Sequence, residues 1–197
     1  MGDPLTRKFH WFSYVAGDDI RATCRPGDPD RFRLVYNGIY GEHLRLYEVD
    51  SVRRRLSAKV SGDGNAARVS GDDLLAPWRA QAAATELDPA AYQRLEQALA
   101  ADGAFGPPAV GLELPSRSYY WTAATCKAGR FTFTAWKYPS PAFEALRFPA
   151  LLLAADATAV PLRPAGPIAF DPQLADDERQ GKVVSFTLEV GAEGMVR

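Results

Sequence analysis

The chain has 197 residues, of which 47% are hydrophobic and 24% are charged, with a formal net charge of −1. These values exclude an intrinsically disordered chain, and no stretch approaches the roughly 20 unbroken apolar residues of a membrane-spanning helix. A pI near 6.1 argues against dedicated nucleic-acid binding, which requires a strongly basic surface. We expect one compact domain over residues 1–197, large enough to bury a core.

Strand patterns dominate the first sixty residues. The aromatic run Phe9–Val15 and the alternating segment Arg31–Tyr36 are typical of strands, with Phe32, Leu34 and Tyr36 on one face. Asn37-Gly38 is the strongest short hairpin signal, and it predicts a returning strand over Ile39–Val49. A further strand is expected at Leu56–Val60.

The middle of the chain carries helix signals, and a helical insert is predicted over about residues 72–103. Asp88-Pro89 combines an N-cap with proline at the first helical position, and Gly103 supplies the stop. Pro77 opens a shorter helix that runs to Glu86. The two helices would form a helical hairpin joined at Leu87-Asp88.

The last third returns to strand patterns. Tyr119–Thr125 and Phe131–Trp136 mix aromatic and β-branched residues, and Val183–Val190 alternates apolar and polar side chains. The proline-rich stretches 106–108 and 161–172 are connectors, too short for interdomain linkers.

Both cysteines lie in the same local phrase, which suggests a duplication. Ala22-Thr23-Cys24 is followed by a basic residue and Gly27, and Ala124-Thr125-Cys126 by a basic residue and Gly129. The copies span about residues 9–60 and 117–170. The predicted fold is therefore α+β and mainly β, an antiparallel sheet or sandwich built from a duplicated strand-hairpin unit with the inserted helical hairpin.

Charge follows the same division of the chain. Residues 1–60 and 116–170 carry net charges of +3 and +4, whereas residues 61–115 and 171–197 carry −5 and −3. Either the acidic segments cover the basic sheets within the fold, or they meet them in a self-association contact. Possible homo-oligomerisation follows from the second alternative.

Motifs for cofactors and metals are weak. Gly62-Asp63-Gly64-Asn65-Ala66-Ala67 fits the pattern G-x-G-x-x-A but is followed by a β-prone segment, so it predicts a hairpin loop rather than a dinucleotide site. No Walker A run, nucleophile elbow or H-E-x-x-H motif is present. We predict no cofactor.

Metal binding is not predicted either. The two histidines, His10 and His43, and the two cysteines lack the close spacing of a zinc clip. The pairs Asp18-Asp19, Asp72-Asp73 and Asp176-Asp177 are interpreted as turn or capping residues rather than cation ligands.

The two cysteines allow three alternatives. They could be buried small side chains, a disulfide joining the two copies, or thiols made reactive by basic neighbours such as Arg25 and Lys127. Two cysteines are too few for a disulfide framework, and the N-terminus lacks the apolar run of a secretory signal, so a cytoplasmic location is the default expectation. A leader removed beforehand is the alternative.

Aromatic and basic side chains on strands are the ingredients for binding on a sheet face. We therefore predict a noncatalytic binding or assembly protein that contacts a small molecule or a protein, through Trp11, Tyr14, Arg33, Tyr120, Trp136 and Lys137. Burial of these residues with no groove beside them would leave a structural or assembly role. The alternative is an enzyme that uses Cys24 with His43, or the carboxylates of Asp18 and Asp19.

Overall fold

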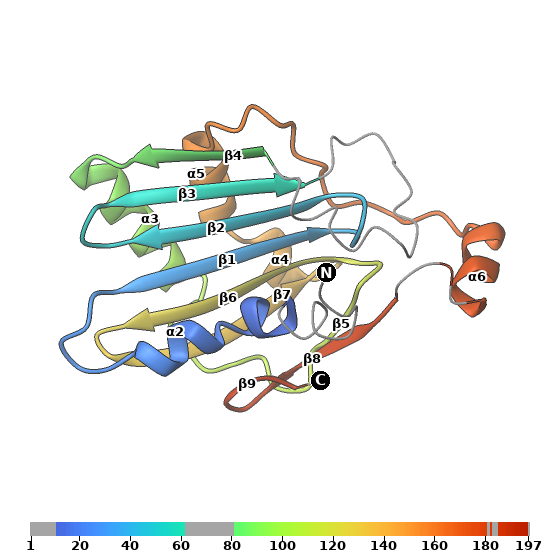
Figure 1. Cartoon of the computed structure of the whole chain (residues 1–197), viewed down its shortest axis with the longest axis horizontal. Coiled ribbons are helices and arrows are strands. Elements are labelled where there is room, and N and C mark those ends of the chain that lie inside the picture. The colour runs from blue at the N-terminus through green and yellow to red at the C-terminus, as the bar shows by residue number, and fades with distance from the viewer. Residues whose placement is uncertain (1–10, 62–80, 181, 183–184, 197) are drawn as a thin grey trace, which may run out of the picture.

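The computed structural model describes residues 11–61, 81–180, 182 and 185–196 (Figure 1). A short helix over residues 11–16 precedes the labelled elements. These are, in chain order, α2 (Asp18–Thr23), β1 (Arg31–Gly38), β2 (Leu44–Asp50), β3 (Arg55–Ser61), β4 (Gln81–Glu86), α3 (Pro89–Ala101), β5 (Glu113–Pro115), β6 (Tyr119–Lys127), β7 (Arg130–Lys137), α4 (Pro141–Glu144), α5 (Phe148–Ala155), α6 (Pro172–Arg179), β8 (Thr187–Gly191) and β9 (Gly194–Val196).

A six-stranded antiparallel sheet organises the fold, in the order β4-β3-β2-β1-β6-β7. One face carries the main core, because Phe32, Leu34 and Tyr36 of β1 alternate toward it together with Tyr47 and Trp121 of the neighbouring strands. Helices α3 and α5 cover this face, behind the sheet in Figure 1. The alternation predicted for β1 is confirmed.

The described residues cover the opposite face over only part of its width. Across β1, β6 and β7 it packs against the helix at residues 11–16, against α2, and against the three-stranded sheet β5-β8-β9. Over β2, β3 and β4 the same face carries Ser57, Lys59 and Ala84, of which Lys59 and Ala84 are exposed. Helix α2 therefore forms a step between a covered half and an open half of the sheet (Figure 1).

The coarse fold prediction is confirmed: the protein is α+β and mainly β, with an antiparallel sheet and a few helices. The predicted cap of α3 is also confirmed, because the Asp88 carboxylate accepts a hydrogen bond from the backbone N–H of Ala91 at 2.7 Å. Pro89 occupies the first turn of α3. The local sequence pattern Asp88-Pro89 therefore predicted the start of α3 correctly.

The predicted strand Phe9–Val15 is wrong for the described residues 11–15, which are helical. Residues four apart share one face in a strand as in a helix, so the spacing of Trp11 and Val15 does not separate the two; the packing of Phe12 and Tyr14 against the same cluster does. Trp11 and Val15 are buried in one cluster with Val35 and Leu44 from the sheet. A strand would have sent Phe12 and Tyr14 to the side opposite Trp11 and broken this cluster.

The predicted helix Pro77–Glu86 is also wrong in its described part, because residues 81–86 form strand β4. Its alanines favour a helix, but β4 pairs with β3 from Val60↔Gln81 to Arg55↔Glu86 and so completes the hydrogen bonds of that strand. Within its described residues, 81–103, the insert contributes one helix, α3, and the helical hairpin predicted to join at Leu87-Asp88 does not form. Residues 77–80 lie outside the described residues.

The turn between β1 and β2 differs from the predicted Asn-Gly hairpin. Asn37 and Gly38 continue β1, and β2 begins at Leu44 rather than Ile39. The Asn37 side chain is buried and donates to the backbone carbonyls of Ser116 and Ser118, which holds it within the sheet. The chain reverses instead through Ile39, whose φ is 71°.

The two cysteine phrases differ on their N-terminal sides. Ala22-Thr23-Cys24 ends helix α2, whereas Ala124-Thr125-Cys126 lies in strand β6. After each phrase the chain turns through a left-handed glycine, Gly27 or Gly129, into a strand that begins with Arg-Phe. The duplication therefore stays a prediction.

Other sequence predictions fall partly or wholly outside the described residues. The loop Gly62–Ala67, the pair Asp72-Asp73 and His10 lie in the segments that the structure does not describe, and the strand predicted at Val183–Val190 is described as β8 from Thr187 onward. Among the described residues, no helix combines the length and apolar character needed to cross a bilayer.

Candidate ligand groove beside helix α2

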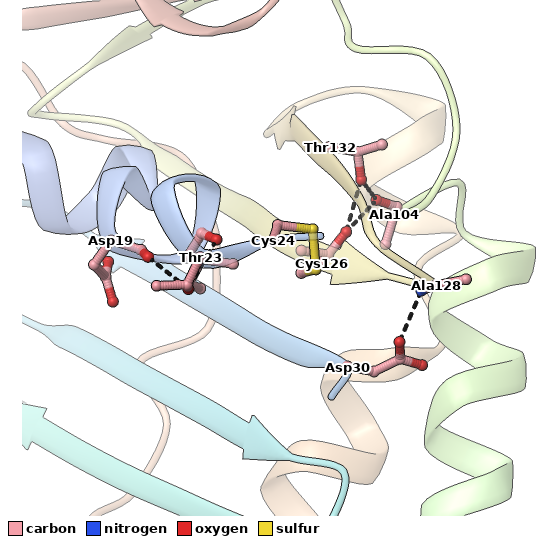
Figure 2. Close-up of a disulfide and its surroundings, with 10 residues drawn as sticks. Asp19, Thr23, Cys24, Asp30, Ala104, Cys126, Ala128 and Thr132 are labelled. Carbon is pink, nitrogen blue, oxygen red and sulfur yellow. Dashed lines mark hydrogen bonds between the residues drawn. A yellow bond between two sulfur atoms is a disulfide. The ribbon is translucent and has the colours of Figure 1, made fainter. Parts of the chain in front are cut away.

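A disulfide fixes the end of α2 to the large sheet. Cys24 is the C-cap of α2 and Cys126 lies in β6, and their sulfurs are bonded with a Cα–Cα distance of 5.6 Å. Figure 2 shows this link beside Thr23, whose hydroxyl donates back to the carbonyl of Asp19 at 3.0 Å. Of the three alternatives for the cysteines, the structure contains the disulfide, and neither cysteine is free.

The start of α2 sits against the same strand. Gly17, the N-cap, has a φ of 72°, and a Cβ placed there would lie 2.4 Å from the Cβ of Ala124 in β6. Glycine is therefore required both by the left-handed backbone and by the close approach. Together with Cys24, this contact places both ends of α2 against β6.

The Arg33 side chain of β1 is hydrogen-bonded to Asp19 in the first turn of α2. Its guanidinium donates to both carboxylate oxygens of Asp19 at 2.7 and 2.9 Å, to the backbone carbonyl of Tyr14 at 2.8 Å, and to Glu48 at 2.9 Å. The Tyr14 ring lies 3.7 Å from the guanidinium carbon, and its hydroxyl donates to Glu48. Arg33 is only 2% exposed, and its three guanidinium nitrogens all donate hydrogen bonds to groups within the protein.

Electrostatics keep this network ionised. Burial by itself would raise the pKa of Asp19, but the hydrogen bonds and charge of Arg33 outweigh it and hold that pKa below its usual value. Burial raises the pKa of the Tyr14 hydroxyl, so this group remains a protonated donor to Glu48. The network is a structural clamp on α2, with a buried cation and two half-exposed carboxylates.

The other predicted binding residues are dispersed through the core. Trp11 and Tyr120 are buried in separate clusters over β1 and β6, and Trp136 is buried on the opposite face beneath α5. Lys137 follows Trp136 in β7 and is half-exposed. Of the six predicted residues, the structure therefore brings together Trp11, Tyr14 and Arg33, because the Tyr14 ring contacts both of the others.

The residues named for an enzyme do not converge. Cys24 and His43 lie at opposite ends of β1. Cys24 is bonded to Cys126, which pairs with Arg31, the first residue of β1. The carbonyl of His43 accepts a hydrogen bond from the backbone N–H of Gly38, the last residue of β1. The buried His43 side chain accepts from Arg45 through Nε2. Asp18 accepts from the Ser13 hydroxyl at 2.6 Å and, with Asp19, forms the first turn of α2.

Two adjoining hollows lie along the step between α2 and the open half of the sheet, and we call them together the α2 groove. One hollow, of about 410 Å³, lies beside the disulfide and has a largely apolar lining that includes Ile20, Pro29 and Val52. The other, of about 320 Å³, continues over β2 and β3 past Glu48 and Ser57. They share four lining residues, Ile20, Arg31, Asp50 and Arg53.

Three arginines line the α2 groove, and their charges are only partly used. Arg53 pairs with Asp50 at 3.0 Å, and Arg31 reaches Asp19 at 3.5 Å. Arg55 has no ion-pair partner among the residues that the structure describes. Asp28, Glu48 and Asp50 also line the groove, and Glu48 is engaged by Arg33, so the unpaired positive charge lies at the Arg55 end.

Sequence reasoning missed the groove arginines. Arg53 and Arg54 follow Val52 in the turn between β2 and β3, and Arg55 begins β3. A run of three arginines beside an exposed valine was the available signal. Only the tertiary fold places Arg53 and Arg55 opposite α2.

Comparisons with known proteins show no match among protein-family models, curated proteins or solved structures. Within the described part of the chain, no group of three or more His, Cys, Asp or Glu side chains is placed to hold a metal ion. Among the described residues, the α2 groove joins an apolar hollow to the side chains of three arginines.

Proposed function

We propose that the chain is a noncatalytic interaction domain that binds an acidic, partly apolar segment of a protein partner in the α2 groove. The observation that carries this proposal is the combination of an apolar hollow beside the disulfide with three arginines along one continuous groove. Basic side chains of a sheet face supply the contact, whereas the aromatic ones support it from the core.

The charges of the groove favour an anionic ligand. Arg55 is exposed and unpaired within the described part of the chain, and Lys59 lies four residues further along, on the same face of β3. Arginine presents a planar fork that binds carboxylates bidentately, so a segment rich in Asp or Glu suits this surface.

The shape of the groove favours a polypeptide over a small molecule. Its two hollows are half-open and lie end to end from the disulfide to β3. Small-molecule sites usually enclose most of their ligand, whereas an extended segment can lie in an open groove and place one side chain in a pocket. The hollow beside Ile20 and Val52 would receive that apolar side chain.

A labelled peptide tests this proposal. The probe is a fluorescein-labelled 12-residue peptide of alternating aspartate and phenylalanine, and binding is followed by fluorescence anisotropy. We expect binding to the native protein that weakens as salt rises, because exposed charge pairs are screened. Arg53→Glu with Arg55→Glu should weaken binding at least tenfold.

The matched control is Arg94→Glu with Arg147→Glu, two exposed arginines outside the groove. This control should bind the peptide as the native protein does, and a lysine–phenylalanine peptide should not bind. Equal affinities of the groove and control variants for the acidic peptide would refute the proposal.

The enzyme alternative has less support. The Cys24 sulfur is engaged in the disulfide, and the Asp19 carboxylate is engaged by Arg33. A catalytic site would instead need groups that converge on one pocket in a reactive state.

We also propose that residues 9–60 and 117–170 arose by duplication of one unit. The support is the shared passage from a cysteine, through a basic residue and a left-handed glycine, into a strand that begins with Arg-Phe. In this proposal the N-terminal half of the first copy became helical when residues 11–16 and α2 came to cover the second copy.

A further inference from the structure

We infer that residues 161–167 are a preformed polyproline II ligand for a partner protein whose binding groove is lined by aromatic side chains. We call the side chains of Pro161, Pro164 and Pro167 the proline stripe. The inference goes beyond the proposed function, because none of these residues lines the α2 groove. It is carried by the spacing of the prolines, by exposure that follows the same period, and by contacts that hold the segment against the core.

The prolines of the stripe recur at every third position. A polyproline II helix has three residues per turn, so side chains at this spacing lie along one face. Proline fixes its own φ at about −65° and biases the residue before it toward the same extended region. Those preceding residues are Val160, Arg163 and Gly166. The sequence therefore restricts most of the segment to polyproline II geometry.

Exposure in the structure follows the same period. The three prolines are exposed, whereas Leu162 and Ala165, one position after the first and second of them, are partly buried against the main core. The segment between α5 and α6 forms no helix or strand (Figure 1). Among the described residues, no backbone group of residues 161–170 is hydrogen-bonded to another backbone group, as polyproline II geometry requires. The segment thus presents its proline face to solvent and another face to the core.

Contacts on the buried side hold the segment in place. The Tyr36 hydroxyl donates to the carbonyl of Arg163 at 2.8 Å, and the Arg45 guanidinium donates to the carbonyl of Val160. The Arg163 side chain also forms an ion pair with Glu42. These contacts fix the backbone from one side and leave the proline face open. Because the segment is ordered before binding, little conformational entropy is lost when a partner docks on it.

The surface of the segment is apolar and almost uncharged. Between residues 157 and 170 the one charged side chain is that of Arg163, which is paired with Glu42. Phe170 lies three positions after Pro167 and is 83% exposed, so it continues the apolar surface at the same spacing. Grooves lined by aromatic rings bind such segments, because P-x-x-P prolines in polyproline II geometry pack against the flat rings.

A lipid surface fits the segment less well. Segments that bind membrane surfaces combine exposed apolar side chains with lysine and arginine, which are attracted to anionic lipids. Residues 171–178, which follow Phe170 directly, instead carry four acidic side chains and no basic one. The partner that the chemistry favours is therefore a proline-recognising protein domain.

Isothermal titration calorimetry of the full chain with isolated SH3 domains tests this inference. The probes are a panel of these domains, because their aromatic-lined grooves bind P-x-x-P segments. We expect at least one domain of the panel to bind the native protein. The same domain with the aromatic side chains of its groove replaced by alanine should not bind. Pro164→Ala with Pro167→Ala should weaken binding at least tenfold, because two of the three rings of the stripe are removed.

Pro26 and Pro29 provide the matched control, because they have the same P-x-x-P spacing and are also exposed. Their loop contains a turn in which the N–H of Asp28 donates to the carbonyl of Arg25 at 3.0 Å, and polyproline II geometry contains no such bond. Pro26→Ala with Pro29→Ala should therefore bind the SH3 domain as the native protein does. Thermal unfolding checks that both proline variants remain folded.

The outcomes keep this inference separate from the proposed function. Arg53→Glu with Arg55→Glu weakens binding of the acidic peptide in the α2 groove and should leave SH3 binding unaltered. A panel in which no domain binds, or binding that survives Pro164→Ala with Pro167→Ala, would overturn the inference. Binding to phosphatidylcholine vesicles that is lost in Phe170→Lys and kept in the proline variant would also overturn it.

Discussion

Cys24 and Cys126 are separated by 102 positions in the sequence and are joined by a disulfide in the fold. The link connects the end of α2 to the strand β6 that α2 covers, and it forms part of the apolar end of the α2 groove. Covalent and noncovalent contacts thus hold the same helix against the sheet.

Removal of this disulfide should destabilise the protein strongly. A cross-link that closes a loop of about 100 residues restricts the unfolded chain, and the expected loss is about 4 kcal/mol. The measurement is urea unfolding of the native protein with and without reductant, and of Cys24→Ala with Cys126→Ala. Mass spectrometry after alkylation provides the control, because the native, unreduced protein should take up no alkyl group. Similar stabilities with and without the bond would contradict the prediction.

Loss of the Arg33 guanidinium should cost about 1.5 to 3 kcal/mol, because buried hydrogen bonds are lost while the Asp19 and Glu48 carboxylates stay half-exposed to water. Arg33→Met leaves Asp19 and Glu48 without the cation that they share. Arg31→Met is the matched control, because Arg31 lies two residues away and makes one longer contact at 3.5 Å with half-exposed partners. Its cost should stay below about 1 kcal/mol. Equal costs in urea unfolding would show that the Arg33 network is not a clamp.

Asp156 should make stability depend on acid pH. Burial would raise its pKa, but hydrogen bonds from Thr158 and Tyr47 and the charge of Arg45 outweigh burial and lower it. Because the folded pKa lies below the unfolded value of about 3.9, the carboxylate stabilises the fold above about pH 4, and this contribution disappears as the pH falls through the folded pKa.

Asp156→Asn should therefore flatten the dependence of the unfolding free energy on pH between about pH 5 and pH 3. The variant should also lose about 3 kcal/mol at neutral pH, because Arg45 is 1% exposed and would lack its counterion. Asp176→Asn, at an exposed helix position, should change stability by less than about 0.5 kcal/mol. An unchanged pH profile for Asp156→Asn would contradict the assignment.

Gly17→Ala should destabilise the contact between α2 and β6. The substitution adds a Cβ 2.4 Å from that of Ala124 and strains a left-handed backbone. Gly27→Ala separates the two effects, because Gly27 also has positive φ but a Cβ there meets nothing within 4 Å. The control should lose only the backbone cost of about 1 to 2 kcal/mol, and Gly17→Ala should lose more in thermal unfolding. Identical losses would rule out the close approach.

The sequence predicted the elements whose signals are local. Alternation placed Phe32 and Leu34 on one face of β1, and the Asp88-Pro89 pair marked the start of α3, because strand pleat and helix capping depend on a few adjacent residues. The same local patterns predicted the strands β3, β6 and β7. The coarse fold class followed from them.

Only the tertiary structure decided which partner each segment finds. Residues 81–86 form a strand because their backbone pairs with β3. Trp11 is buried on a helix because it packs against the apolar side chains of Val35 and Leu44. Arg33 was predicted to lie on a binding surface, but its side chain is buried and its guanidinium donates hydrogen bonds to Asp19 and Glu48. The sequence by itself determined the alternation of β1 and the capped start of α3. Burial, the disulfide and the groove arginines were decided by contacts between distant residues, whose energies no local pattern contains.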